Sequence, residues 1–408
     1  MVKNRPFLGT EVFLLKVAIV GGSLTEIKSR LDADAFTLSL RVIREALRDA
    51  NLEAKDIDGI LTTPPGYFTD PSDMDRFAPQ RMGEYLYTNA KAQAMIDMGG
   101  MTSLAAVKYG AYEIMQGRCR TVLIYASEKY VSREKWNPQR HTYLIHLVNG
   151  IYGPHDRRYG VMRAAVYYAM AAQRYMYEYK VSREEIAHVP VVLRENASMN
   201  PKAQYREPIT VEDVLNSRPV CPPLNLLDCC PVSEGGAAVI LADEKTARDL
   251  GKDDCYIVGI GEAHDPTSFF PVYQSVTEIP SLRRATREAL RHAGMSLRDI
   301  DVAEVYGPFS GTELMVYEEM GFYERGEAAK AVAEGRTKIN GDTPINPSGG
   351  RLSFGHPPYV TPLAEIYEIV AQLRGEAGKR QVEDAEAGLV HAEHGMMNGN
   401  MVMIVKRR

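Results

Sequence analysis

The sequence predicts an α/β protein made of two related halves. Short apolar runs alternate with segments whose apolar residues recur every three or four positions, as strands and amphipathic helices do. Two segments also return later in the chain: 44–48 (REALR) matches 287–291, and 56–58 (DID) matches 299–301. Both matches lie 243 positions apart. A shared, ungapped spacing indicates that one α/β unit was duplicated and then diverged.

The first half starts with the apolar run KVAIVGG, which is typical of a buried strand that ends on glycine. Phe36, Leu40, Ile43 and Leu47 then fall on one face of a helix. In order, the elements expected in this half are a strand at 16–22, a helix at 35–50, a strand at 58–62, a helix at 101–116, a strand at 121–126 and a closing strand at 239–242.

The second half repeats this order with different residues. The elements expected there are a strand at 256–260, a helix at 280–293, a strand at 302–306, a helix at 363–374 and a strand at 388–391. We therefore divide the chain into an N-terminal half, 1–250, and a C-terminal half, 251–408. An insertion of about 127–218 interrupts the first half and carries an aromatic and basic stretch before a helix at 161–179. Long insertions on such scaffolds usually serve binding.

Each half has a helix that follows a pair of glycines. Gly99-Gly100 opens the helix of the first half, and Gly349-Gly350 precedes that of the second, in the segment 346–357 (NPSGGRLSFGHP). Helix starts present free N–H groups and a partial positive charge, which suit an oxyanion. His356 in the second segment is able to move a proton near neutral pH. The sequence therefore predicts a site that polarises a carbonyl group, although the same segment is also compatible with a simple strand-to-helix turn.

Composition excludes several classes of function. The net charge is −5 and the pI is about 6.1, so nucleic acid and anionic membranes are not expected as partners. The five cysteines include no CxxC pair, which argues against a disulfide framework and favours a reducing cytoplasm. No apolar run approaches the ~20 residues of a membrane span. We expect a cytoplasmic globular protein.

The doubled α/β unit, together with its motifs, resembles the thiolase superfamily, and most of all its sterol-carrier and lipid-transfer-protein branch. The stretches that carry the resemblance are 346–357, 168–177 (YAMAAQRYMY), 208–220 (PITVEDVLNSRPV), 224–241 (LNLLDCCPVSEGGAAVIL), 305–309 (VYGPF) and 321–327 (GFYERGE). The resemblance implies a five-layered α-β-α-β-α fold with duplicated βαβαβ halves. It also implies a homodimer and a coenzyme A thioester as substrate, with no cofactor beyond the coenzyme A of the substrate.

The sequence departs from the catalytic pattern of that family at three places. Gly100 stands where the family has its nucleophilic cysteine, and Tyr306 stands where the family has an asparagine. The second cysteine of the family has no counterpart in the segment that begins His394-Gly395. His356 alone remains of the usual catalytic set. Covalent acyl-enzyme chemistry needs an activated nucleophile beside a base, and the chain has no evident one.

Members of this branch without the cysteine resemble retro-aldolases that act on β-hydroxyacyl-CoA, notably in steroid side-chain degradation, with a small OB-fold and zinc-ribbon partner. We therefore expect Tyr306 to transfer the proton, while His356 and the backbone of Gly99, Gly100 and Gly395 stabilise the enolate oxygen. His394 is a further acid–base candidate, with His155 and His391 as alternatives. The residues expected to contact the substrate are Ser348, Gly349 and Gly350. No metal site is expected, because the pair His391 and His394 is weak evidence for one.

Two other functions stay open. One is a thiolase or acyltransferase whose nucleophile is non-standard or comes from a partner. The other is a non-catalytic subunit that binds coenzyme A or lipid after its site has decayed. Retention of His356 in an intact Gly-His-Pro turn argues against complete decay. The sequence does not name the acyl group.

Overall fold

The computed structural model describes residues 16–64, 77–129, 158–159, 163–266, 275–395 and 397–408. Nine strands of this part of the chain form one mixed sheet in the order β3-β2-β4-β7-β1-β8-β11-β10-β9. The strands are β1 (Val17–Leu24), β2 (Gly59–Thr62), β3 (Ala92–Met95), β4 (Thr121–Glu128), β7 (Gly235–Asp243), β8 (Cys255–His264), β9 (Val302–Glu304), β10 (Ala387–His394) and β11 (Gly399–Arg407). A short hairpin, β5 (Pro219–Cys221) and β6 (Leu224–Asn225), lies apart from it.

Eight of these nine strands are arranged symmetrically about the centre of the sheet, while β3, at the edge of the first half, has no counterpart among the described residues. β1 and β8 pair antiparallel there, with Val17 opposite Ile257. Outward from this pair, each half continues with an antiparallel neighbour (β7 or β11), then a strand antiparallel to that neighbour (β4 or β10), then a parallel strand (β2 or β9). The short helical turns η1 (Ala54–Asp56) and η6 (Leu297–Asp299) carry the same capping box at the repeat spacing. The predicted duplication is confirmed.

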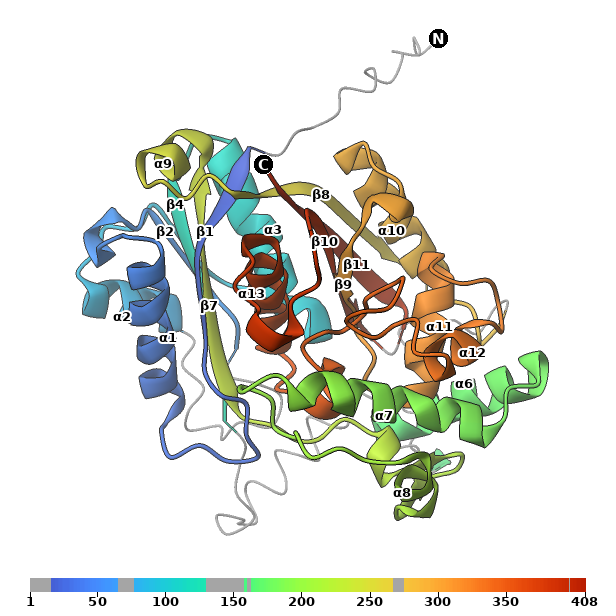
Figure 1. Cartoon of the computed structure of the whole chain (residues 1–408). Coiled ribbons are helices and arrows are strands. Elements are labelled where there is room, and N and C mark those ends of the chain that lie inside the picture. The colour runs from blue at the N-terminus through green and yellow to red at the C-terminus, as the bar shows by residue number, and fades with distance from the viewer. Residues whose placement is uncertain (1–15, 65–76, 130–157, 160–162, 267–274, 396) are drawn as a thin grey trace, which may run out of the picture.

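The helices complete five layers (Figure 1). α1 (Ala35–Asp49) and α2 (Ala78–Leu86) cover the outer face of the first half, and α10 (Pro280–Ala293) covers that of the second. α3 (Thr102–Met115) and α13 (Thr361–Arg374) lie between the two halves. The predicted α-β-α-β-α fold is confirmed. Because β1 pairs with β8, the two sheets of this fold are joined into one.

Side-chain patterns explain which helix takes which layer. α1 buries one face, starting from an Asp34 cap that accepts the N–H of Thr37, and leaves its other face in solvent. α13 is buried along nearly its whole length, as a helix between two sheets must be. Along β4, Val122 and Ile124 point to the inner core while Leu123 points to the outer one, so both faces of the strand are packed.

The insertion crosses from the first half to the second. Its helices are α6 (Ala164–Tyr179), α7 (Arg183–Ser198) and α8 (Val211–Asn216). α6 and α7 pack on α11 (Ser310–Met320), and α7 also packs on α12 (Ala328–Ala333) and on the helical turn η7 (Gly350–Phe354). Figure 1 shows these green helices beneath the orange second half. The aromatic and basic stretch and His155 lie outside the described residues.

The remaining elements are η3 (Gly99–Met101), η5 (Leu226–Asp228), α9 (Glu244–Asp249) and η8 (Gly378–Arg380). Several predicted boundaries differ from the structure. The strands expected at 239–242, 256–260 and 388–391 are extended by as many as four residues at one end in β7, β8 and β10. The strand expected at 302–306 ends at Glu304, because the backbone N–H of Tyr306 donates to the side chain of His391 on β10 instead of to a backbone oxygen. The helix expected from 363 starts at Thr361, where Pro362 fits the first turn. No helix in the described ranges has both the length and the apolar character to cross a bilayer.

Candidate active site

The glycine-led turn of the first half meets Tyr306 of the second. η3 places Gly100 against the end of β10, where a Cβ atom on Gly100 would collide with the backbone oxygen of Glu393. The same Cβ would lie 3.2 Å from the Tyr306 hydroxyl oxygen. A side chain at position 100 therefore has no room, and the phenol of Tyr306 stands beside the helix start.

Tyr306 lies in the turn that follows β9 and is buried, with 8% of its surface exposed. Its backbone N–H donates to His391 Nδ1 at 3.3 Å. Its ring meets the His356 ring edge to face, with 5.6 Å between the ring centroids and 89° between the planes. The two predicted catalytic side chains are thus in contact distance of each other.

Arg351 connects these two residues. It comes from η7 and is fully buried, and its guanidinium lies 3.8 Å from the centroid of the Tyr306 ring. One nitrogen, Nη1, donates to His356 Nδ1 at 3.1 Å, and Nη2 pairs with Glu365 at 2.9 Å. A guanidinium over a phenol ring stabilises negative charge on that phenol. Arg351 is therefore placed to stabilise negative charge that develops on the Tyr306 phenol during a proton transfer.

Arg351 also fixes the tautomer of His356. Because a guanidinium only donates hydrogen bonds, His356 Nδ1 must accept, and the ring proton stays on Nε2. Burial, followed by the Arg351 cation, holds the pKa of His356 well below its usual value. The backbone N–H of His356 donates to Ser233 Oγ at 2.9 Å, which anchors the turn. His356 is therefore a neutral imidazole with an Nε2–H donor, suited to a developing oxyanion.

Comparison with known proteins places this geometry in a family. Residues 17–245 match the model of the thiolase N-terminal domain, and residues 261–407 match the thiolase C-terminal domain-like model. The chain belongs to the thiolase family. The expected resemblance is confirmed over nearly the whole chain.

Two of its relatives are named for different activities. The chain is 34% identical to "Acetyl-CoA acetyltransferase" of Methanothermobacter thermautotrophicus over 92% of this chain and 95% of the relative. It is 30% identical to "Steroid side-chain-cleaving aldolase" of Thermomonospora curvata over 95% of this chain and 97% of that protein. Among solved structures, "Ltp2-ChsH2(DUF35) aldolase" matches with a TM-score of 0.78 and 28% identity, over 95% of this chain and 97% of that one.

Four of the five thiols of this chain are poor nucleophiles, because burial raises their pKa. Burial raises the pKa of Cys230 and of Cys255 to about 12. Burial likewise raises the pKa of Cys119 and of Cys229. Because the thiolate is the reactive form, these four cysteines are held in the unreactive thiol form at neutral pH.

His391 and His394, the alternative proton-transfer residues, have different surroundings. Both ring nitrogens of His391 are engaged: Nδ1 accepts from the Tyr306 N–H, and Nε2–H donates to Asn400 Oδ1 at 2.9 Å. Burial lowers its pKa to about 3, so it stays neutral. The ring of His394 lies 6.3 Å from that of His264, and burial and His264 lower its pKa. Gly395 next to it has a φ of +65°, a conformation that glycine adopts readily.

The predicted substrate-contacting residues are packed into the protein. Ser348 donates its hydroxyl and backbone N–H to the buried Glu304 at 2.7 and 2.9 Å. Gly349 and Gly350 face α7 and have positive φ values of 108° and 56°; a Cβ on Gly349 would collide with Ala197. These contacts explain the glycines by packing and turn geometry, and direct contact with substrate stays a prediction. Among the residues described, no three or more His, Cys, Asp and Glu side chains are grouped as metal ligands.

One acidic side chain at the site was missed in the sequence. Glu393, at the end of β10, is buried and accepts a hydrogen bond from the hydroxyl of Tyr168 on α6. Burial raises the pKa of Glu393 to about 7, although the Tyr168 hydroxyl opposes this. In the sequence, the only signal that pointed to Glu393 is its position beside the predicted His394.

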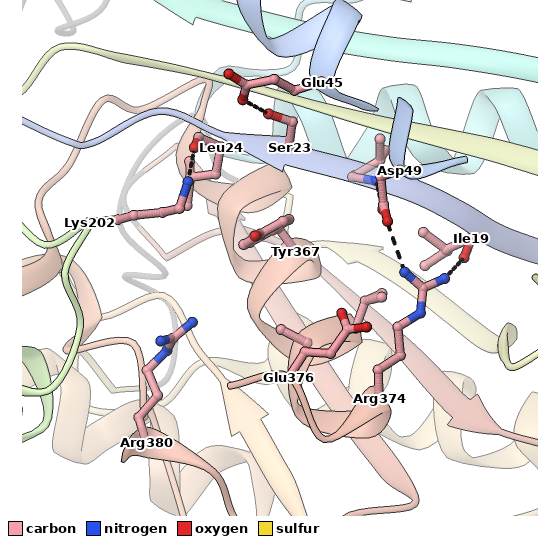
Figure 2. A pocket seen from close by; sticks show the side chains of 14 residues that line it. Ile19, Ser23, Leu24, Glu45, Asp49, Lys202, Tyr367, Arg374, Glu376 and Arg380 are labelled. Carbon is pink, nitrogen blue, oxygen red and sulfur yellow. Dashed lines mark hydrogen bonds and ion pairs between the residues drawn. The ribbon is translucent and has the colours of Figure 1, made fainter. Parts of the chain in front are cut away.

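A polar cleft of about 280 Å³ lies at the other end of α13, where Tyr367, Arg374 and Lys202 line it (Figure 2). Arg374 pairs with Asp254 at 2.8 Å and lies 3.6 Å from Asp49 on α1. The cleft thus holds both cations and carboxylates from the two halves, so its ion pairs join the halves. The predicted chemistry lies at the opposite end of α13, beside Thr361.

Proposed function

We propose that this thiolase-superfamily enzyme cleaves a carbon–carbon bond of a β-hydroxyacyl-CoA by a retro-aldol reaction, without a covalent cysteine intermediate. The observation that carries the proposal is the Tyr306 hydroxyl beside Gly100. A proton-transfer group stands there, and no side chain fits at position 100.

The geometry supports a division of roles. The Tyr306 phenolate, with its negative charge stabilised by Arg351, accepts the proton of the β-hydroxyl. The bond between Cα and Cβ then breaks, a ketone or aldehyde leaves, and the electron pair forms the thioester enolate. The enolate oxygen accepts hydrogen bonds from His356 Nε2–H and from the backbone N–H of Gly100 in η3. The N–H of Gly99 donates to Asp97 Oδ1 at 3.4 Å.

The names of the relatives support the substrate class and suggest a partner. The Thermomonospora curvata relative is named for cleavage of steroid side chains, so we propose a bulky acyl group here as well. The similar aldolase structure carries two protein names, Ltp2 and ChsH2(DUF35). We propose that this chain forms a homodimer in the cytoplasm and works with a small OB-fold and zinc-ribbon protein.

An acyltransferase is the second candidate, because the Methanothermobacter thermautotrophicus relative is named acetyl-CoA acetyltransferase at 34% identity. That reaction in its usual form passes through an acyl-cysteine. The raised pKa values of Cys230 and Cys255 argue against one in this chain.

The test is a panel of acyl-CoA esters, with and without a candidate partner, followed by mass spectrometry of the small molecules and of the intact protein. The proposal expects a carbonyl product and a shortened acyl-CoA in equal amounts from a tertiary β-hydroxyacyl-CoA. Thiolytic acyl transfer together with an acyl adduct that turns over would establish the acyltransferase instead.

A further inference from the structure

The Tyr168–Glu393 pair is a buried acid at the site that the mechanism above leaves unused. Glu393 is 2% exposed and Tyr168 is 3% exposed. The hydroxyl of Tyr168 donates to Glu393 Oε1, which ties the insertion helix α6 to the end of β10. A buried carboxyl is costly unless it is hydrogen-bonded or protonated, so its place beside a reaction site calls for a chemical explanation.

Several contacts place this pair in the wall of the same site. The backbone oxygen of Glu393 and the hydroxyl of Tyr306 both border the point where a Cβ on Gly100 would be. The Tyr168 ring stacks on Phe309, three residues after Tyr306, with 4.7 Å between the centroids. The Tyr306 and Arg351 side chains are both near enough to influence the pair electrostatically. The pair thus adjoins Tyr306 and is itself buried.

Retro-aldol cleavage needs two proton transfers at different atoms. The β-oxygen loses a proton, and the enolate carbon must then gain one before the shortened acyl-CoA leaves. Tyr306 and the His356 donor account for the first transfer and for the enolate oxygen. A carboxyl group whose pKa is about 7 is partly protonated at neutral pH and is therefore able to donate.

We propose that Glu393 is the acid that protonates the enolate carbon, and that Tyr168 is the positioning residue that holds its carboxyl group. This inference rests on the proposed retro-aldol function. The proton leaves the Glu393 carboxyl, a C–H bond forms at Cα, and the resulting carboxylate is stabilised by the Tyr168 O–H. After product release Tyr306 returns its proton to solvent and Glu393 takes one up, so the cycle is balanced and needs no oxidant or reductant.

The reverse of this step gives an assay that is independent of bond cleavage. By microscopic reversibility, the Glu393 carboxylate removes an α-hydrogen from the shortened acyl-CoA. Propionyl-CoA or acetyl-CoA incubated with the wild type in D₂O should therefore gain deuterium at Cα, as followed by mass spectrometry. We expect Glu393→Gln to lower the exchange rate by ~10²–10⁴, the usual contribution of a general acid or base. Glu393→Asp, which keeps the acid, should retain part of it.

The chain offers a matched control on the same helix. Tyr175, two turns after Tyr168 on α6, donates its hydroxyl to the buried Glu318 on α11. Glu318→Gln and Tyr175→Phe should leave exchange unchanged, whereas Tyr168→Phe should reduce it by about tenfold. Thermal unfolding of every variant shows whether a loss comes from misfolding. If Glu393→Gln does not fold, Glu393→Asp and Tyr168→Phe decide, because the first moves the carboxyl group and the second removes only the hydroxyl that donates to it.

Two results would overturn the inference: no exchange by the wild type, or exchange by folded Glu393→Gln at the wild-type rate. Tyr306→Phe separates this inference from the proposed function, because it should lose cleavage and keep exchange. A wild type that cleaves β-hydroxyacyl-CoA while Glu393→Gln is unimpaired refutes the role of Glu393 alone. Exchange that depends on Glu393 in an enzyme that cleaves no β-hydroxyacyl-CoA refutes the retro-aldol function alone.

Discussion

Replacing Arg351 tests whether a cation over the phenol makes Tyr306 a base. Arg351→Met removes the guanidinium that lies 3.8 Å from the Tyr306 ring centroid and donates to His356. The change also leaves Glu365 buried without its partner, so we pair it with Glu365→Gln. A desolvated cation–π contact contributes about 2 kcal/mol, which corresponds to a loss of ~30-fold in rate. The lost hydrogen bond to His356 adds about 1 kcal/mol, or about another fivefold.

The assay is the pH dependence of retro-aldol turnover, with binding of the acyl-CoA measured separately by calorimetry. We expect the double variant to lose ~10²-fold in turnover at neutral pH and to recover as the pH rises, because a phenol without the cation ionises at higher pH. Arg380→Met with Glu368→Gln is the control, since this ion pair is also buried, with 2.8 Å between its atoms, and Glu368 lies one turn further along α13 than Glu365. Equal pH profiles for wild type and Arg351 variant, both folded, would refute the reasoning.

Three further outcomes are expected. Tyr306→Phe should lower turnover by ~10²–10⁴ with little effect on binding, whereas His356→Ala should cost about 3–4 kcal/mol of transition-state stabilisation. Turnover by both variants at the wild-type rate would refute these two roles, and binding of acyl-CoA without turnover by the wild type would favour the binding-subunit function. Burial raises the pKa of Glu128 to about 8, so the folded protein keeps a proton that the unfolded chain loses near pH 4.5. The free energy of unfolding should therefore fall as pH rises from about 4.5 to about 8, and Glu128→Gln should flatten this fall over the same range in chemical denaturation; equal slopes would contradict it. Acetyl-CoA should leave no acyl mass on the intact protein, and an adduct that tracks turnover would restore the acyltransferase.

The fold was predictable because its signals are local. Strand and helix patterns, the repeat at 243 positions and the family motifs all lie in short stretches of sequence. Several element ends differed from the prediction, and the early end of β9 at Glu304 depends on the His391 side chain taking the N–H of Tyr306. Such choices are made by tertiary contacts, which a periodicity does not record.

The site was predictable only where a motif marked it. His356 and Tyr306 stand at family positions, and the structure brings them together. Arg351 has no such mark: its role depends on a turn that carries its long side chain under the Tyr306 ring. The Tyr168–Glu393 pair joins residues 225 positions apart, and no local pattern connects them.

The pairing of β1 with β8 joins the two copies of the duplicated α/β unit into one sheet, and both copies contribute to the candidate site. The two copies share the order of strand pairing outward from β1 and β8. The first copy contributes the backbone of Gly100 to the candidate site, whereas the second contributes the side chains of Tyr306 and His356. After the duplication, the glycine-led turn of the first copy kept only backbone groups at the candidate site, while the second copy acquired polar side chains there. In the proposed mechanism neither copy holds a complete reaction site by itself. Catalysis therefore requires that both copies have folded and packed together.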